Sequence, residues 1–164
     1  MPHRPQPGQV HGLPLVPEPC RGCVHGCHYC FARRYNSYAD LDPSNDFSGL
    51  VFVKTNVVNV LREELSLHSW VSETVAIGTA TDPYQPIEGK YRLTRGCLEA
   101  LAERHTPVRI VTKGTMILRD VDILADMGAE VQIVCGEVQR GTPRFRSKLI
   151  PPHPHVAQDR LPDF

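Results

Sequence analysis

The sequence predicts an α/β fold built on a parallel β-sheet. Two observations carry this prediction: short apolar runs recur between residues 51 and 134, and the segments between them carry apolar residues at helical spacing. Strands that alternate with helices of about ten residues are typical of βα units, whose strands lie parallel. The 164 residues of the chain are enough for one domain with a hydrophobic core.

The composition divides the chain into three regions. Residues 1–12 are rich in proline and glycine, and we expect a flexible N-terminus there. Residues 13–135 carry the periodic patterns and form the predicted core. Residues 136–164 are rich in proline and show no helical or strand period, so we expect an irregular tail.

In the first half of the core, residues 13–16 are expected to be extended and to lead into a loop that contains several cysteines. Residues 31–38 fit one or two helical turns, and residues 51–53 fit a brief first strand. A helix capped by Thr55 or Asn56 is predicted next, because the apolar residues that follow lie on one helical face; they are Val57, Val58, Leu61 and Leu65.

In the second half of the core, residues 74–78 and 108–112 are predicted to be the second and third strands. A helix from Leu93 separates them. A further helix is expected to be capped by Asp120 and to end at Gly128, and residues 130–134 form the fourth strand. The carboxyl ends of these strands would then share one edge of the sheet, together with the cysteine loop, the segment 79–90 and Lys113.

The cysteines at positions 23, 27 and 30 are the most informative motif in the chain. Three thiolates on so short a loop can bind three irons of a cubane iron–sulfur cluster and leave the fourth iron open to a small molecule. With Cys20, the same run contains two Cys-x-x-Cys pairs, which favours a structural zinc site as an alternative. Zinc ribbons usually separate such pairs by about 15–20 residues, whereas only three residues lie between these. Disulfides are a third interpretation, although nothing else in the chain indicates secretion.

The charge pattern excludes some classes of partner. Lys plus Arg and Asp plus Glu both total 18, so no global field attracts nucleic acid or anionic lipid. A local basic patch at Arg21, Arg33 and Arg34 is compatible with this balance. The apolar stretches are shorter than a membrane span, and the N-terminus lacks the apolar core of a signal peptide. We therefore expect a cytoplasmic protein whose thiols stay reduced; Cys97 and Cys135 are expected to be buried apolar residues.

Three segments together resemble a known family. They are Arg21-Gly-Cys-Val-His-Gly-Cys-His-Tyr-Cys-Phe-Ala-Arg33, Gly78-Thr-Ala-Thr-Asp-Pro-Tyr-Gln-Pro-Ile-Glu88 and Val111-Thr-Lys-Gly114. They are similar to segments of radical S-adenosylmethionine (radical SAM) enzymes, and more narrowly to the branch that includes spore photoproduct lyase. The resemblance implies a partial (βα) barrel of the radical SAM type. It also implies a [4Fe-4S] cluster on Cys23, Cys27 and Cys30, S-adenosylmethionine at the open iron, and an electron donor of the flavodoxin or ferredoxin type.

The resemblance also implies residues that bind the cofactor. Tyr29 would pack near the adenine, and Lys113 would neutralise the methionine carboxylate or a substrate phosphate. The polar candidates for the methionine amino group are Thr81, Asp82, Tyr84 and Glu88. A plain alternative is that this segment builds a rigid turn with a solvated Glu88, and that Lys113 is an ordinary surface residue. His25 and His28 could tune the cluster, and no residue is predicted to be catalytic.

A barrel of about six βα units needs on the order of 180 residues. The predicted strands stop at residue 134, so we expect a barrel that is incomplete at its C-terminal side, as in a truncated enzyme. The loops that would select a substrate are largely absent from such a half barrel. A nucleic-acid substrate is suggested only by the lyase relatives, and the neutral charge argues against it.

Overall fold

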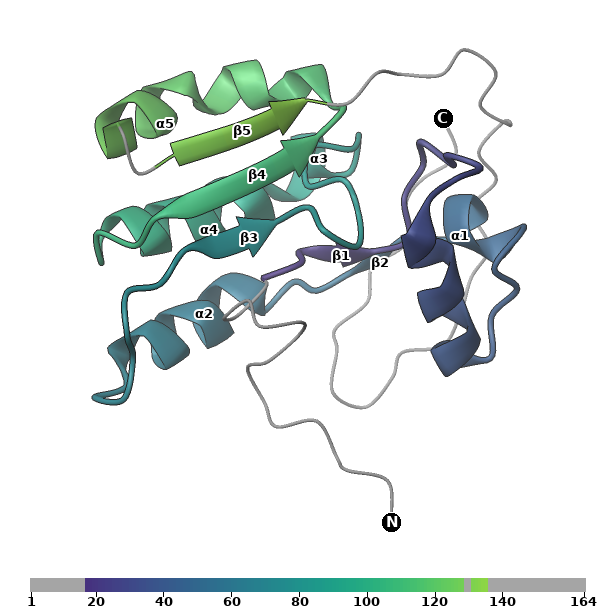
Figure 1. Ribbon diagram of the computed structural model, residues 1–164, viewed down its shortest axis with the longest axis horizontal. Coiled ribbons are helices and arrows are strands. Elements are labelled where there is room, and N and C mark those ends of the chain that lie inside the picture. Colours follow the sequence, from purple (N-terminus) through teal and green to yellow (C-terminus); the bar gives the residue numbers. More distant parts are fainter. Residues whose placement is uncertain (1–16, 129–130, 136–164) are drawn as a thin grey trace.

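The computed structural model describes residues 17–128 and 131–135, which form two small β-sheets and the helices packed on them (Figure 1). Strands β1 (Cys20–Arg21) and β2 (Phe52–Val53) are antiparallel, with Cys20 opposite Val53. Strands β3 (Val75–Ile77), β4 (Val108–Thr112) and β5 (Val131–Cys135) form a parallel sheet in that order. The prediction of an α/β fold with a parallel sheet is confirmed.

A strand forms within the predicted residues 51–53, but it does not join the parallel sheet as predicted. Phe52 and Val53 pair antiparallel with the segment just before the cysteine loop, instead of joining the parallel sheet. The reason is local: β2 has only two residues, and Val53 is fully buried against Cys20 and Leu93 in a separate apolar cluster. Periodicity predicts a strand but does not identify its neighbour.

The helices in chain order are η1 (Phe31–Ala39, 3-10), α1 (Asp46–Gly49), α2 (Val57–Ser66), α3 (Glu88–Tyr91), α4 (Leu93–Ala102), η2 (Thr115–Asp120, 3-10) and α5 (Val121–Met127). Helices form at the four predicted positions, where the structure has η1, α2, α4 and α5, whereas α1, α3 and η2 were not predicted. Asp120 precedes α5 as predicted, but its carboxylate caps no backbone N–H and instead binds Arg95 and Arg119. Gly128 ends α5 with a positive φ of 57°, as the sequence predicted.

The main core lies between the parallel sheet and the helices α2, α4 and α5. Leu61 of α2, Leu98 of α4 and Leu124 of α5 all pack in one cluster with Ile77 of β3 and Ile110 of β4. Along β4, residues 108, 110 and 112 are buried while residues 109 and 111 are exposed. One face of the sheet is therefore covered by helices, and the opposite face is open in the part of the chain that the structure describes.

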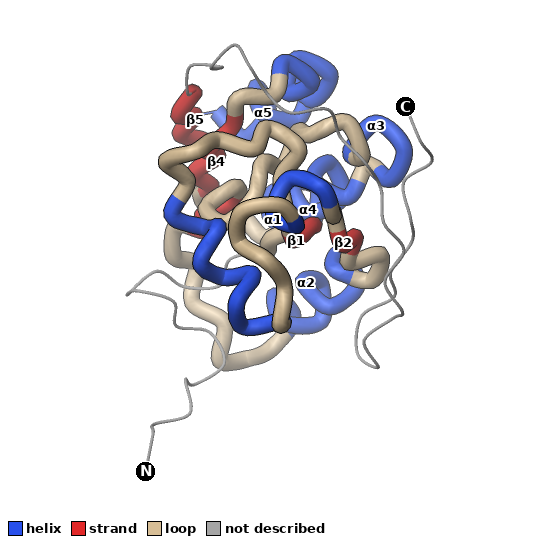
Figure 2. Tube along the Cα trace, turned by 90° about the vertical axis from the view of Figure 1, so that its right-hand side faces the viewer, coloured by secondary structure: helices blue, strands red, loops and turns tan. Residues whose placement is uncertain are grey.

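The strands β4 and β5 point their carboxyl ends toward the side of the molecule where η1 and α1 lie (Figure 1). Figure 2 views this side directly, with η1 and α1 in front and the strands behind. The cysteine loop, which we define as residues 22–30, leads into η1 at this side. The cysteine loop and the carboxyl ends of the core strands therefore lie on the same side of the molecule, as predicted.

The parallel sheet does not close into a barrel within residues 17–128 and 131–135, in agreement with a partial radical SAM fold. Over the same residues, each helix is too short or too polar to cross a membrane. The predicted flexible N-terminus (1–12), the extended segment (13–16) and the irregular tail (136–164) lie outside the described residues.

Candidate functional site

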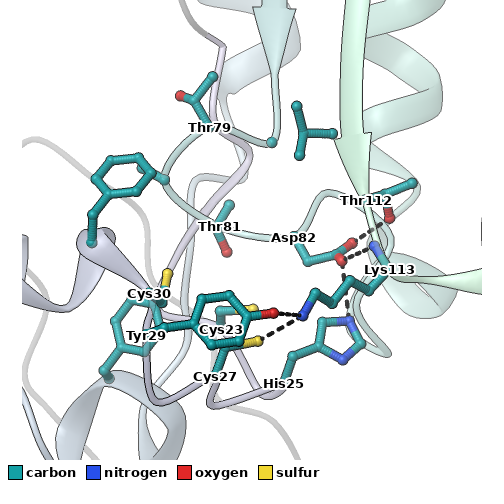
Figure 3. Close-up of a pocket in the computed structure, with 15 residues that line it drawn as sticks. Cys23, His25, Cys27, Tyr29, Cys30, Thr79, Thr81, Asp82, Thr112 and Lys113 are labelled. Atoms are coloured by element: carbon teal, nitrogen blue, oxygen red, sulfur yellow. Dashed lines mark hydrogen bonds and ion pairs between the residues drawn. The ribbon is translucent and has the colours of Figure 1, made fainter. Parts of the chain in front are cut away.

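A pocket lies where the cysteine loop meets the carboxyl ends of β3 and β4 (Figure 3). Ligand sites in parallel α/β sheets are usually found at this edge. The polar and sulfur-containing residues that line it come from three separate segments: Cys23, His25, Cys27, Tyr29 and Cys30; Thr79, Thr81 and Asp82; and Thr112 and Lys113. The apolar part of the wall is formed by Phe31, Phe47 and Val111 among others. The structure therefore brings together the three segments that the sequence singled out.

The predicted cluster ligands Cys23, Cys27 and Cys30 all line this pocket. Two consecutive turns shape the loop that carries them, since the Gly26 N–H donates to Cys23 O at 3.1 Å and the Cys30 N–H donates to Cys27 O at 3.2 Å. Cys23 is buried, whereas Cys27 and Cys30 are half-buried. Burial raises the pKa of Cys23 to about 12, although hydrogen bonds from backbone N–H groups oppose this shift. Its thiol must lose a proton when it binds metal.

The two predicted kinds of metal site differ in how their thiolates are arranged. A zinc ion requires all its thiolates at about 2.3 Å from one point, while a cubane binds each thiolate through a different iron. Among the described residues, no three His, Cys, Asp or Glu side chains converge as one ion would require. The three loop cysteines share one pocket.

Cys20, the fourth thiolate of the zinc alternative, does not lie on the pocket. It packs with Val53, Ile87 and Leu93 in a different apolar cluster, and its pKa is raised to about 12 mainly by burial. The structure thus separates Cys20 from the other three cysteines. Cys97 is fully buried in the main core, as the sequence predicted; the side chain of Cys135 lies outside the described part.

Asp82 connects the cysteine loop to the end of β4. Its Oδ1 accepts hydrogen bonds from the Tyr84 N–H at 2.8 Å and from Thr112 Oγ1 at 2.7 Å, and its Oδ2 accepts one from the Lys113 N–H at 2.6 Å. His25 Nε2 lies 3.1 Å from the same Oδ2. Burial alone would raise the pKa of Asp82, but the groups directed at its carboxylate outweigh burial and lower the pKa below the usual value.

Lys113 reaches across the pocket to the cysteine loop. Its Nζ lies 2.6 Å from Tyr29 Oη and 3.2 Å from Cys27 Sγ, and it stands 5.0 Å from the centre of the Tyr29 ring. The bond to Tyr29 is the main reason that the pKa of Lys113 is raised, with Cys27 adding to the shift. The Tyr29 side chain is 64% exposed. Lys113 is therefore not an ordinary surface lysine, because it places a positive charge beside a predicted cluster ligand.

The hydroxyl groups of Thr79 and Thr81 bind the residues that flank β1. Glu18 Oε1 accepts hydrogen bonds from the Thr79 N–H at 2.6 Å, Thr79 Oγ1 at 2.8 Å and the Ala80 N–H at 2.9 Å. Thr81 Oγ1 donates to the carbonyl oxygen of Gly22. These contacts attach the loop after β3 to the chain on both sides of β1.

Two predicted cofactor residues, Tyr84 and Glu88, do not line the pocket. Tyr84 is buried in the main core beside Asp120, and burial followed by this carboxylate raises its pKa. Glu88 is only 3% exposed, so the alternative of a solvated Glu88 is wrong. Its carboxylate accepts hydrogen bonds from the N–H groups of Thr94 and Arg95 at 3.0 and 3.3 Å, and from Arg119 at 2.8 Å.

Sequence reasoning missed three buried or half-buried residues that hold the site together. Glu18 binds the loop after β3, and Gln85 binds the backbone on both sides of Cys23. The guanidinium of Arg33 binds the carbonyl oxygens of Gly26 and Cys27, the latter at 2.8 Å, and lies 5.1 Å above the Phe47 ring. The sequence suggested only a local basic patch at Arg33. A buried amide or guanidinium that binds main chain leaves no periodic pattern by which a sequence could reveal it.

Comparison with known proteins relates the chain to one superfamily and to several uncharacterized proteins. The profile of the radical SAM superfamily matches residues 18–157. Uncharacterized proteins of Mycobacterium tuberculosis and Mycobacterium bovis are each 45% identical to the chain, over 79% of this chain and 42% of theirs. An uncharacterized protein of Methanocaldococcus jannaschii is 27% identical over 71% of this chain. The chain thus spans 42% of the length of these relatives, and no solved structure matches it significantly.

Proposed function

Because the chain belongs to the radical SAM superfamily, we propose that Cys23, Cys27 and Cys30 bind a [4Fe-4S] cluster whose open iron binds S-adenosylmethionine. The observation that carries this proposal is that the three side chains line one pocket at the carboxyl ends of β3 and β4. A reduced cluster held by Cys23, Cys27 and Cys30 would supply the one electron for reductive cleavage of the C5′–S bond of S-adenosylmethionine, and this cleavage would give methionine and a 5′-deoxyadenosyl radical that takes a hydrogen atom from a substrate.

Within this proposal, the pocket residues bind and orient the cofactor. Lys113 supplies a positive charge for the methionine carboxylate or for a substrate phosphate, and Tyr29 lies beside it for contact with the adenine. Thr81 and Asp82 line the same pocket, but their side chains already bind Gly22 and the end of β4. We assign to them the role of shaping the methionine end of the pocket. Tyr84 and Glu88 support the surrounding fold instead.

The proposed reaction also requires a source of electrons. We propose an electron donor of the flavodoxin or ferredoxin type, which delivers the electron, and a cytoplasmic location, where the thiols stay reduced. The narrower resemblance to spore photoproduct lyase stays a prediction, since the relatives compared have no assigned activity. A nucleic-acid substrate is disfavoured by the formal net charge of zero. The substrate class therefore remains to be found by experiment.

Anaerobic reconstitution with iron and sulfide tests the proposal directly. We expect about four irons and four sulfides per chain. Substitution of Cys23, Cys27 or Cys30 by Ala should abolish this uptake. Cys20→Ala is the matched control, because Cys20 is as buried as Cys23 but lies off the pocket, and its cluster content should equal that of the unchanged chain. A single zinc ion that is lost in Cys20→Ala would support the zinc module and overturn the proposal.

A further inference from the structure

The backbone on both sides of Cys23 is bound by side chains from the loop after β3. The carbonyl oxygen of Gly22 accepts hydrogen bonds from Thr81 Oγ1 and from Gln85 Nε2, the latter at 3.2 Å. The Val24 N–H donates to Gln85 Oε1 at 3.1 Å. Gln85 Nε2 also donates to Thr81 Oγ1 at 2.9 Å, so the two side chains support each other. One amide therefore binds the residue before Cys23 and the residue after it.

The chemistry of this contact requires an amide. A glutamine side chain offers an acceptor and donors at one end, which matches an N–H and a carbonyl two residues apart along the chain. A carboxylate would place an oxygen against the Gly22 carbonyl, and an aliphatic side chain would leave both backbone groups without a partner. Gln85 is 1% exposed, so water cannot replace it at low cost. Gln85 does not line the pocket, whereas Cys23 does.

We propose that Gln85 is a positioning residue that, with Thr81, orders the cysteine loop around Cys23 before any cluster binds. A loop whose thiolates must reach three irons loses conformational entropy on binding, and a loop that is already ordered loses less. The purpose of this ordering, which is to hold Cys23 ready for a cluster, rests on the proposed function. The ordering of the loop is itself a property of the metal-free chain. Gln85 acts through the backbone of Gly22 and Val24 and contributes no ligand.

Limited proteolysis of the metal-free chain measures this order. Trypsin can cleave after Arg21, next to Gly22, and its rate follows the local opening of this backbone when reclosing is fast. We expect Gln85→Leu, which replaces the amide by a shorter aliphatic side chain, to speed cleavage at Arg21 by about tenfold to thirtyfold, because two hydrogen bonds to the loop are lost. Thr81→Val removes the other donor to Gly22 with little change in volume and should give a smaller increase, of about fivefold.

Thr106→Val is the matched control. Thr106 is fully buried and polar, and it lies just before β4, at the end of the sheet opposite the cysteine loop. It should leave cleavage at Arg21 unchanged even if it lowers global stability. Equal cleavage rates at Arg21 in the unchanged chain, Gln85→Leu and Thr81→Val would overturn the inference. Should Gln85→Leu fail to fold, the rate for Thr81→Val decides in the same way.

A second readout separates this inference from the proposed function. After anaerobic reconstitution, Gln85→Leu should lose its iron–sulfur absorbance to a chelator about tenfold faster than the unchanged chain, with the cysteine ligands intact. If the unchanged chain takes up no cluster, the proposed function fails, and the proteolysis result still decides whether Gln85 orders the loop. If the cluster forms but leaves both chains at the same rate, the role of Gln85 in cluster binding is refuted.

Discussion

Replacement of Glu88 by Ala should destabilise the fold, although the family resemblance made this residue a candidate for cofactor binding. The Glu88 carboxylate is buried and accepts hydrogen bonds from the N–H groups of Thr94 and Arg95 in the first turn of α4. It also forms an ion pair of 2.8 Å with Arg119. The carboxylate therefore caps α4 and ties it to η2, which places Glu88 in the framework of the fold.

The magnitude follows from these contacts. Removal of one partner of a buried ion pair typically costs about 3–5 kcal/mol. Arg119 keeps a second carboxylate, Asp120, with which it has contacts of 2.8 and 2.9 Å, so the cost should lie at the low end. Loss of the cap adds about 1 kcal/mol. We expect Glu88→Ala to lower the free energy of unfolding by about 3–4 kcal/mol. Glu88→Gln keeps the volume and one acceptor, and it should cost about 1–2 kcal/mol.

Urea unfolding of the metal-free chain, followed by circular dichroism, measures these differences. Glu103→Ala is the matched control, because Glu103 also pairs with an arginine, Arg62, at 2.9 Å, but their side chains are 61% and 46% exposed. An exposed pair of this kind should contribute less than about 1 kcal/mol. The reasoning is refuted if Glu88→Ala costs no more than Glu103→Ala, or if it leaves stability unchanged and removes only cofactor binding.

Three further predictions concern other parts of the site. Gly78→Ala should prevent stable folding, since φ is +90° and the added Cβ would meet a carbonyl oxygen at 2.1 Å; Gly128→Ala, where the space is open, should lower the melting temperature only modestly. In the metal-free chain at pH 8, Cys27 should react with a thiol reagent far faster than Cys97, because Cys97 is buried and burial raises its pKa to about 12. Mass spectrometry of the labelled peptides would show which cysteine is labelled first. Lys113→Met should make the midpoint potential of the reconstituted cluster more negative in a redox titration, because a positive charge beside a ligand sulfur is lost; an unchanged potential would contradict this.

The sequence allowed the site to be located because its chemistry is concentrated in short motifs. Polar residues that follow two buried strands must lie close together if the strands are parallel, and the pocket contains both of these sets beside the three cysteines of one loop. Periodicity also predicted β4 over residues 108–112 and α4 from Leu93. These patterns depend on local spacing, which a single sequence displays directly.

The roles of individual side chains could not be predicted in the same way. Glu88 and Tyr84 follow β3 within the same segment as Thr81 and Asp82, but the turns at residues 82–88 direct them into the core. Likewise, Gln85 looked like part of a plain turn, and its contacts with Gly22 and Val24 join residues more than 60 positions apart. Which hydrogen bonds a buried side chain makes depends on tertiary neighbours, and these have no signature in the spacing of one segment.

The central claim is that the three loop cysteines leave one iron of a cluster open for S-adenosylmethionine. Electron paramagnetic resonance of the anaerobically reduced, reconstituted chain, recorded with and without S-adenosylmethionine, tests it most directly. We expect the nucleoside to change the g values of the cluster signal in the unchanged chain and in Cys20→Ala. Identical spectra with and without S-adenosylmethionine would contradict the claim, because a cofactor bound to iron must alter the signal of that iron.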